Sequence, residues 1–263
     1  MRYIDTHSHL NLEQFDNDRE EVMTRMRAAG VATVTVGVDF ATSKKAVELA
    51  EKYPDVILGA TIGVHPIDSE ENFDPAVYAP LLASGHVVAV GECGLDYFRT
   101  PRDEAYERQK SVFEKQLAFA IEHNLPMMLH VRPSKGTDDA HDDAIQLLEA
   151  LRQKHGGAVR GTAHFFTASL AAAQKYWNIG FATSFPGVIT FAKETEAVVR
   201  AAPKELMLAE TDAPFAAPVP YRGQCCEPTH VIEVVKKISQ LRGEEEGTIE
   251  KQLIENAQRI FKI

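Results

Sequence analysis

Short apolar segments that favour strands alternate with amphipathic segments along the whole sequence. Strands are expected about 20 to 40 residues apart, which is the scale of one βα unit. The eight expected strands cover Tyr3–Asp5, Thr33–Val38, Ile57–Ile62, Val87–Gly91, Met127–His130, Gly161–His164, Phe181–Ser184 and Leu206–Ala209. Because these segments are apolar without polar alternation, they suit a parallel sheet whose two faces are both covered.

The segments between the strands have the apolar spacing of amphipathic helices. Gly30 follows the first of them and suits a helix end. The expected helices cover Asn17–Ala29, Ser43–Lys52, Asp103–Glu122, Asp143–Lys154, Pro228–Leu241 and Ile249–Phe261. Strands alternating with helices in this way predict an α/β fold, a single (β/α)8 TIM barrel that forms one domain over residues 1–263. A doubly wound open sheet is the alternative, but no glycine-rich turn follows the first strand.

The net charge, the cysteines and the lack of long apolar segments limit which partners and which cell compartment we expect. The net charge is −10 without any basic segment, which argues against a broad electrostatic surface for long nucleic acid. A nuclease that concentrates its positive charge in the site is not excluded. The cysteines Cys93, Cys225 and Cys226 form no disulfide framework, and no segment resembles a signal peptide or a membrane span. We expect a soluble, cytoplasmic protein with no membrane association and no obligate protein partner.

His7 and His9 directly follow the first expected strand. Alternate residues of an extended strand point the same way, so both imidazoles can bind one metal ion. The spacing alone is weak evidence, because ten histidines make such a pair common by chance. Its position is stronger evidence, because the end of a barrel strand is where this fold places catalytic groups.

Four further strand ends carry a possible metal ligand: Glu92, His130, His164 and Asp212. Each alone could be structural, but together with His7 and His9 they occupy five of the eight strand ends. We predict that all of them bind metal at the C-terminal ends of the strands. Six ligands suit two divalent ions that share a carboxylate. Imidazole favours zinc or manganese, although magnesium could support activity. Asp212, as ligand and proton acceptor, and Glu92 are the predicted catalytic residues.

Several blocks of the sequence together resemble the TatD-type metal-dependent deoxyribonucleases, a branch of the amidohydrolase-like barrels. The resemblance covers essentially the whole chain. It lies in Asp5–Leu10, Gly63–Pro66, Gly91–Tyr97, His130–Arg132, His164–Thr167, Ser184–Gly187, Glu210–Pro214, Pro220–Gly223, Glu227–Pro228 and Asn256–Phe261.

The resemblance implies a (β/α)8 fold with two metal ions and Glu92 as the ligand that bridges them. The first ion would also be held by His7, His9 and Asp212. The second ion would also be held by His130 and His164. The implied reaction is hydrolysis of phosphodiester bonds in DNA, at chain ends or in short single strands.

Three other residues are candidates for binding a substrate phosphate. Arg222 follows the last expected strand, and a guanidinium can hold a phosphate through two hydrogen bonds; a surface salt bridge is the alternative. His65 and Arg132 could also contact phosphate, although Arg132 could instead pair with Asp138. Tyr97 and Phe98 could stack on a base or pack beneath a loop.

The segment after His130 departs from the resemblance, because residues 133–143 form a longer and more acidic loop. Phe165-Phe166 and Cys225-Cys226 also depart from it. An acidic loop near the site would repel a long polyanion. The main alternative function is therefore hydrolysis of a small ester, lactone or cyclic amide, as in the wider amidohydrolase superfamily. There a carboxylated lysine often bridges the metals, so Glu92 favours the nuclease. A barrel that binds a metal or a partner without catalysis is a third reading.

Overall fold

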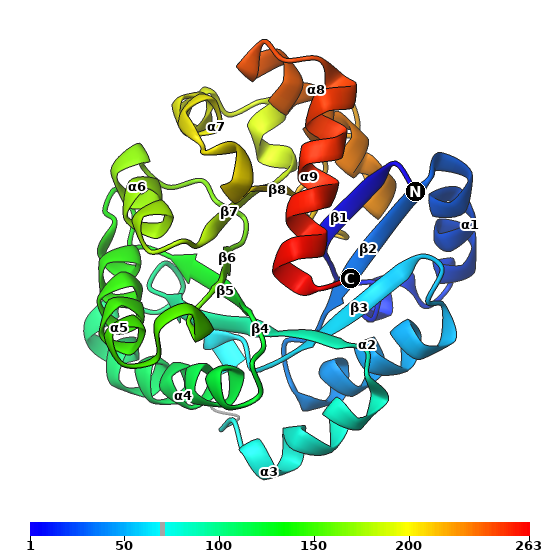
Figure 1. Cartoon of the computed structure of the whole chain (residues 1–263). Helices are drawn as coiled ribbons and strands as arrows, with labels where there is room; N and C mark the ends of the chain where they lie inside the picture. Colours follow the sequence, from blue (N-terminus) through cyan, green and yellow to red (C-terminus); the bar gives the residue numbers. More distant parts are fainter. Residues whose placement is uncertain (69–71) are drawn as a thin grey trace.

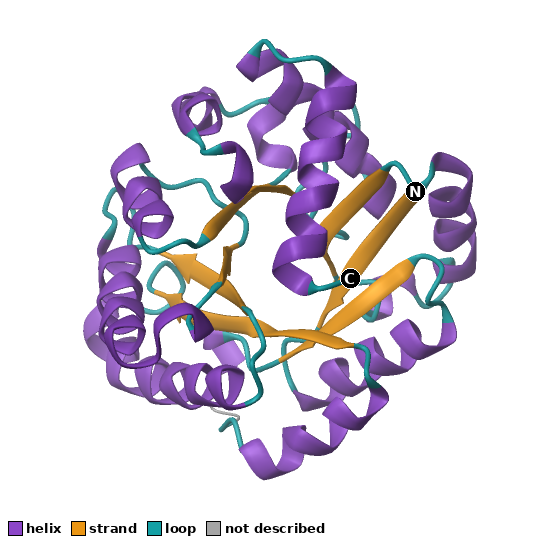
Figure 2. Cartoon of the chain, in the orientation of Figure 1, coloured by secondary structure: helices purple, strands orange, loops and turns teal. Residues whose placement is uncertain are grey.

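The computed structural model describes residues 1–68 and 72–263, and its strands form an eight-stranded parallel sheet curled into a nearly closed barrel (Figures 1 and 2). The strands pair in sequence order: β1 Tyr3–Ser8, β2 Val31–Val36, β3 Ile57–Ile62, β4 Val87–Asp96, β5 Met127–Arg132, β6 Gly161–Ala163, β7 Ala182–Phe185 and β8 Met207–Ala209. Ser8 and Ala213 form a parallel bridge where β1 meets the segment after β8. The predicted (β/α)8 fold is confirmed.

Most helices cover the outside of the barrel (Figure 2). They are α1 Arg19–Ala29, α2 Phe40–Lys52, α3 Pro75–Tyr78, α4 Arg102–Glu122, α5 Asp139–His155, α6 Leu170–Asn178, α7 Glu196–Ala201, α8 Val231–Arg242 and α9 Glu246–Phe261. The sequence pattern misses α3, α6 and α7, which are short. In α6 the run of alanines hides the apolar stripe, although Ser169 accepts a hydrogen bond from the Ala172 N–H and caps its start. No helix in the described part of the chain is long and apolar enough to cross a bilayer.

Three strands continue further into polar residues than predicted, and the first of them is β1, which runs to Ser8 instead of Asp5. β4 continues through Glu92 to Asp96, and its pairing with β5 shifts register between Val90 and Cys93. β5 in turn continues to Arg132. The apolar pattern ends where side chains turn polar, but the backbone ladder continues because hydrogen bonding does not depend on side-chain polarity.

Residues 139–143 of the predicted acidic loop form the start of α5, which begins four residues earlier than expected. Asp139 accepts hydrogen bonds from the backbone N–H groups of Ser134 (2.9 Å) and Ala140 (2.8 Å). Asp142 and Asp143 form ion pairs with lysine and arginine side chains of other helices. Carboxylates are favourable at a helix N-terminus, so these aspartates stabilise the start of α5.

The inside of the barrel is filled by apolar side chains and is closed at one end by α9. Figure 1 shows α9 in red lying across the barrel beside β1. Inward side chains of the strands pack in one buried cluster with residues of α9: Ile4, Val34, Val36, Val88, Ala89, Met128, Ala182, Leu208, Ala257, Ile260 and Phe261. The polar residues are therefore left to the opposite rim, where the strands have their carboxyl ends.

Candidate active site

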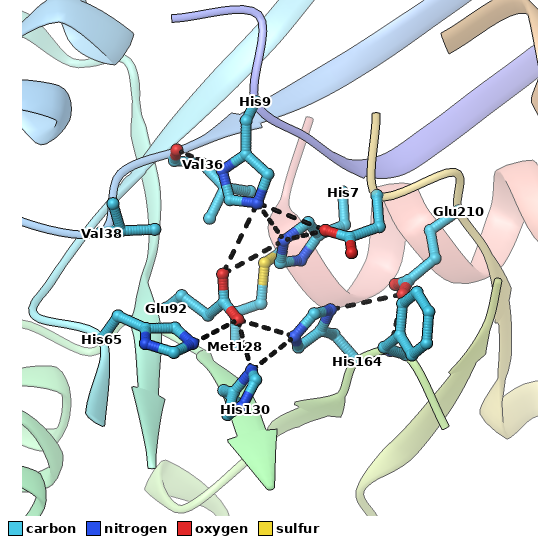
Figure 3. Close-up of polar contacts among 12 residues, drawn as sticks. His7, His9, Val36, Val38, His65, Glu92, Met128, His130, His164 and Glu210 are labelled. Carbon is cyan, nitrogen blue, oxygen red and sulfur yellow. Dashed lines mark hydrogen bonds and ion pairs between the residues drawn. The ribbon is translucent and has the colours of Figure 1, made fainter. Parts of the chain in front are cut away.

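The predicted metal ligands lie together at the carboxyl ends of β1, β4, β5, β6 and β8 (Figure 3). A cavity of about 710 Å³ opens there and is lined by five of the six, with His7 buried beneath. The structure therefore brings these side chains together, and metal binding by them stays a prediction. The lining five are His9, Glu92, His130, His164 and Asp212.

Glu92 lies at the centre of the site, and its two carboxylate oxygens face different partners (Figure 3). Oε2 lies 3.4 Å from His7 Nε2 and 3.6 Å from His9 Nε2. Oε1 lies 2.7 Å from His130 Nδ1 and 2.8 Å from His164 Nε2. One carboxylate thus separates two sets of imidazole nitrogens.

Asp212 completes the first set, because its Oδ1 lies 3.5 Å from His7 Nε2 and 3.3 Å from His9 Nε2. Asp212 has a left-handed backbone (φ 60°), which aspartate tolerates better than most residues. Its N–H donates to the His7 carbonyl oxygen (2.9 Å). The buried Asp5 carboxylate accepts from the N–H groups of His7 (3.2 Å) and Thr211 (2.9 Å). These bonds fix the end of β1 against the end of β8.

Two buried carboxylates orient the histidines of the second set. His130 Nε2 donates to Asp96 Oδ2 (3.2 Å), and His164 Nδ1 donates to Glu210 Oε1 (3.3 Å). In a neutral imidazole the other ring nitrogen then carries only a lone pair. In both rings that nitrogen is the one facing Glu92, which is itself an acceptor when ionised.

Acceptor atoms that face each other at 2.7–2.8 Å repel unless a proton or a cation lies between them. His9 shows the same arrangement, since its Nδ1 donates to the Val36 carbonyl oxygen (3.0 Å) and its Nε2 faces the site. Imidazole and carboxylate are ligands that zinc and similar divalent ions take. The residues present therefore fit metal ions. Three groups of side chains in the described part of the chain have ligand atoms within 4.8 Å of one another: His7, His9 and Asp212; His7, His164 and Glu210; and His65, Glu92 and His130.

Burial and neighbouring charges shift the pKa values inside the site. Burial alone would raise the pKa of Glu92, but the charge of His164 and hydrogen bonds from His130 and His164 hold it well below its usual range. Burial would lower the pKa of His164, but the facing carboxylates Glu92 and Glu210 raise it well above its usual value. The site thus favours an ionised carboxylate at its centre.

His65 approaches the same oxygen of Glu92, with its Nε2 3.5 Å from Oε1. Its Nδ1 accepts the Ile67 N–H (3.2 Å), so the proton of the neutral ring lies on Nε2. Burial and the charge of His130 hold the pKa of His65 well below its usual value. The neutral ring therefore presents an N–H donor to the cavity, a group suited to a phosphate oxygen.

The family model described as TatD related DNase matches residues 4–262. The chain belongs to this family. An uncharacterized metal-dependent hydrolase of Bacillus subtilis, YabD, is 40% identical to it over 99% of each chain. A 3'-5' ssDNA/RNA exonuclease TatD of Pectobacterium parmentieri is 33% identical over 97% of each chain. The crystal structure of YjjV, a TatD homologue of Escherichia coli, matches with a TM-score of 0.88 and 29% identity, covering 100% of this chain and 98% of that one.

In this TatD-related chain the two predicted arginines have different surroundings. The Arg132 guanidinium lies over the Phe98 ring at 3.9 Å and lines the cavity. It does not pair with Asp138, which instead accepts from the Ser169 hydroxyl, so the ion-pair alternative for Arg132 is wrong. The Arg222 guanidinium lies 4.0 Å from the Phe191 ring and outside the lining of this cavity. Phosphate binding by either arginine stays a prediction.

The structure decides the role of Tyr97, whereas base stacking by Phe98 stays a prediction. Tyr97 is buried, and its hydroxyl donates to Asp143 Oδ2 (2.8 Å), so it packs beneath the loop. Phe98 is 52% exposed next to Arg132.

Sequence reasoning missed the carboxylates that orient the ligands, above all Asp96 and Glu210. Both lie in blocks that carry the resemblance, and both follow apolar residues at a strand end. That signal marks them as polar groups that need partners. Their partners, His130 and His164, lie 34 and 46 residues away and follow only from the barrel.

His141, on α5, is a further buried histidine that lines the cavity. Its Nδ1 lies 3.2 Å from the Tyr176 hydroxyl. Burial lowers the pKa of His141 to about 4.

We expect His141 to make the protein less stable in mild acid. Its pKa in the unfolded chain is about 6.5, so the folded state binds fewer protons. The contribution is therefore complete above pH 6.5 and is lost as the pH falls towards 4, at up to about 1.4 kcal/mol per pH unit. Urea unfolding in EDTA at a series of pH values measures this slope, and His141→Gln should make it shallower. Parallel pH profiles of the two proteins would contradict the prediction.

Proposed function

We propose that this chain is a divalent-metal-dependent nuclease that hydrolyses phosphodiester bonds in DNA, at chain ends or in short single strands. The observation that carries the proposal is the division of the Glu92 carboxylate between two sets of ligands. A shared carboxylate of this kind suits two metal ions acting on one phosphate. The relatives that are named 3'-5' ssDNA/RNA exonuclease support the choice of substrate.

We assign one ion to His7, His9 and Asp212 and the other to His130 and His164, with Glu92 between them. Imidazole-rich ligands favour zinc or manganese, and magnesium can also support activity. Such ions, when bound, polarise a phosphate ester and lower the pKa of water.

The protein side chains supply positioning and proton transfer. Asp212 lines the cavity, and because its Oδ1 faces His7 and His9, we assign the other oxygen to accepting the proton of the attacking water. The Nε2–H of His65 is placed to donate to a phosphate oxygen. Arg132, and Arg222 at greater distance, are the candidates for holding the rest of the substrate.

We also propose that residues 1–263 act as one unit in the cytoplasm, without an obligate protein partner. The three cysteines of the chain are free thiols, as expected in a reducing compartment.

A substrate panel tests the proposed function. The metal-loaded protein is incubated with single-stranded DNA, double-stranded DNA, single-stranded RNA, bis(p-nitrophenyl) phosphate, a carboxylic ester and a lactone. We expect cleavage of single-stranded DNA and of the phosphodiester, complete loss of cleavage in EDTA, and recovery when zinc, manganese or magnesium is returned. Cleavage of the ester or lactone alone would refute the nuclease and favour the small-molecule alternative.

A further inference from the structure

Two arginines next to the site lack the partners that other arginines of this chain have. Arg25 donates to Glu227 and Arg102 donates to Asp143, each through two hydrogen bonds. Among the residues that the structure describes, neither Arg99 nor Arg132 has a carboxylate or carbonyl acceptor for its guanidinium. Their donors are therefore free to bind an anion.

Both arginines line the same cavity as Glu92. The Arg132 guanidinium is held against the face of the Phe98 ring. A guanidinium stacked in this way keeps the N–H groups at its edge available for a phosphate. Half-buried Arg132 therefore has a defined position but no anionic partner from the protein.

Asp96 ties these arginines to the proposed metal site. Its Oδ1 accepts hydrogen bonds from the backbone N–H groups of Phe98 (3.0 Å) and Arg99 (2.9 Å). Its Oδ2 accepts from His130 Nε2 (3.2 Å). One buried carboxylate therefore fixes both a predicted metal ligand and the backbone that carries Phe98 and Arg99.

The segment after β5 forms another part of the cavity lining, through Pro133, Thr137 and Asp138. It is held by its own bonds, such as that from the Thr137 hydroxyl to the Ser134 carbonyl oxygen (3.0 Å). The Asp138 carboxylate repels anions, whereas the two guanidiniums attract them. An anionic group in this part of the cavity is thus directed to the arginines.

We propose that Arg99 and Arg132 form a second anion subsite, which binds a phosphate group of the nucleotide next to the scissile bond. The inference rests on the proposed phosphodiesterase function and deepens it. It predicts that the enzyme prefers substrates with two phosphates over an isolated phosphodiester. It also explains how a chain with a net charge of −10 can bind a polyanion, since the positive charge is concentrated where the substrate needs it.

The neighbouring phosphate can come from a terminal phosphate or from the next internal phosphodiester. Four substrates separate these sources: the thymidine dinucleotide TpT, its 5'-phosphorylated and 3'-phosphorylated forms, and the trinucleotide TpTpT. We expect at least one phosphate-bearing substrate to have a kcat/KM about tenfold or more above that of TpT, mainly through KM. The substrate that benefits shows on which side of the scissile bond the subsite lies.

Arg99→Gln and Arg132→Gln should each lower this preference by about tenfold. Lys135→Gln is the matched control, because it removes one positive charge from the exposed segment beside the cavity without removing a lining residue. It should keep the preference. Isothermal titration of the metal-free proteins with the preferred phosphorylated dinucleotide and with TpT measures the same difference without turnover. Arg132→Lys, which keeps the charge, should restore part of the preference.

Equal kcat/KM values for all four substrates, or a preference that survives both glutamine substitutions, would overturn the subsite. Equal loss in Lys135→Gln would also overturn it, because a general effect of charge would then suffice. Failure of the proposed function gives a different result: the natural chain would hydrolyse neither bis(p-nitrophenyl) phosphate nor any of the nucleotides.

Discussion

Asp212→Asn is expected to lower kcat on single-stranded DNA by about a thousandfold or more. The asparagine side chain keeps the volume of the carboxylate but can neither accept the proton nor neutralise a metal ion. Asp212 contacts both His7 and His9 through one oxygen, and only 16% of its side chain is exposed. Steady-state rates at saturating metal measure the effect, and circular dichroism checks that the fold is kept.

Asp138→Asn is the matched control for this substitution. Asp138 also lines the cavity, but it accepts from Ser169 and is not one of the predicted metal ligands. The control removes the same charge from the same cavity and should retain most of the activity. Full turnover by Asp212→Asn would remove Asp212 from the catalytic role.

Glu92→Gln is expected to reduce the bound metal from two ions to at most one and to abolish hydrolysis. The reason is that the two oxygens of Glu92 serve different sets of nitrogens, and an amide offers a single neutral oxygen in their place. Inductively coupled plasma mass spectrometry on the dialysed protein measures the number of ions.

Asp96→Asn is the comparison that distinguishes the loss of a bridging metal ligand from the loss of a residue that only orients a ligand. Asp96 binds no proposed metal ion itself but orients His130. Its substitution should weaken metal affinity by about 10- to 100-fold and leave the number of ions at saturation unchanged. Two ions bound to Glu92→Gln would show that Glu92 does not bridge.

The amino-acid sequence by itself determined the barrel and the set of residues at its rim. The strand Ile57–Ile62 was predicted with its observed bounds, because a buried strand must be apolar along its whole length. The ligand candidates were found for a related reason: a histidine or carboxylate at the end of such a strand has few structural uses. Since parallel strands of a barrel end at one rim, residues such as His7 and Asp212 had to meet even though 205 residues separate them.

Only the tertiary structure decided how these side chains are arranged. It shows that the two oxygens of Glu92 face different histidines, that Asp96 and Glu210 orient the rings, and that the Ile67 N–H makes His65 a donor. It also placed Arg132 on Phe98 instead of against Asp138, and turned residues 139–143 of the acidic loop into the start of α5. These facts depend on register and on side-chain direction across strands that are distant in sequence. A hydrophobic pattern records which residues are buried, but it holds no information on which atoms of two different strands face each other.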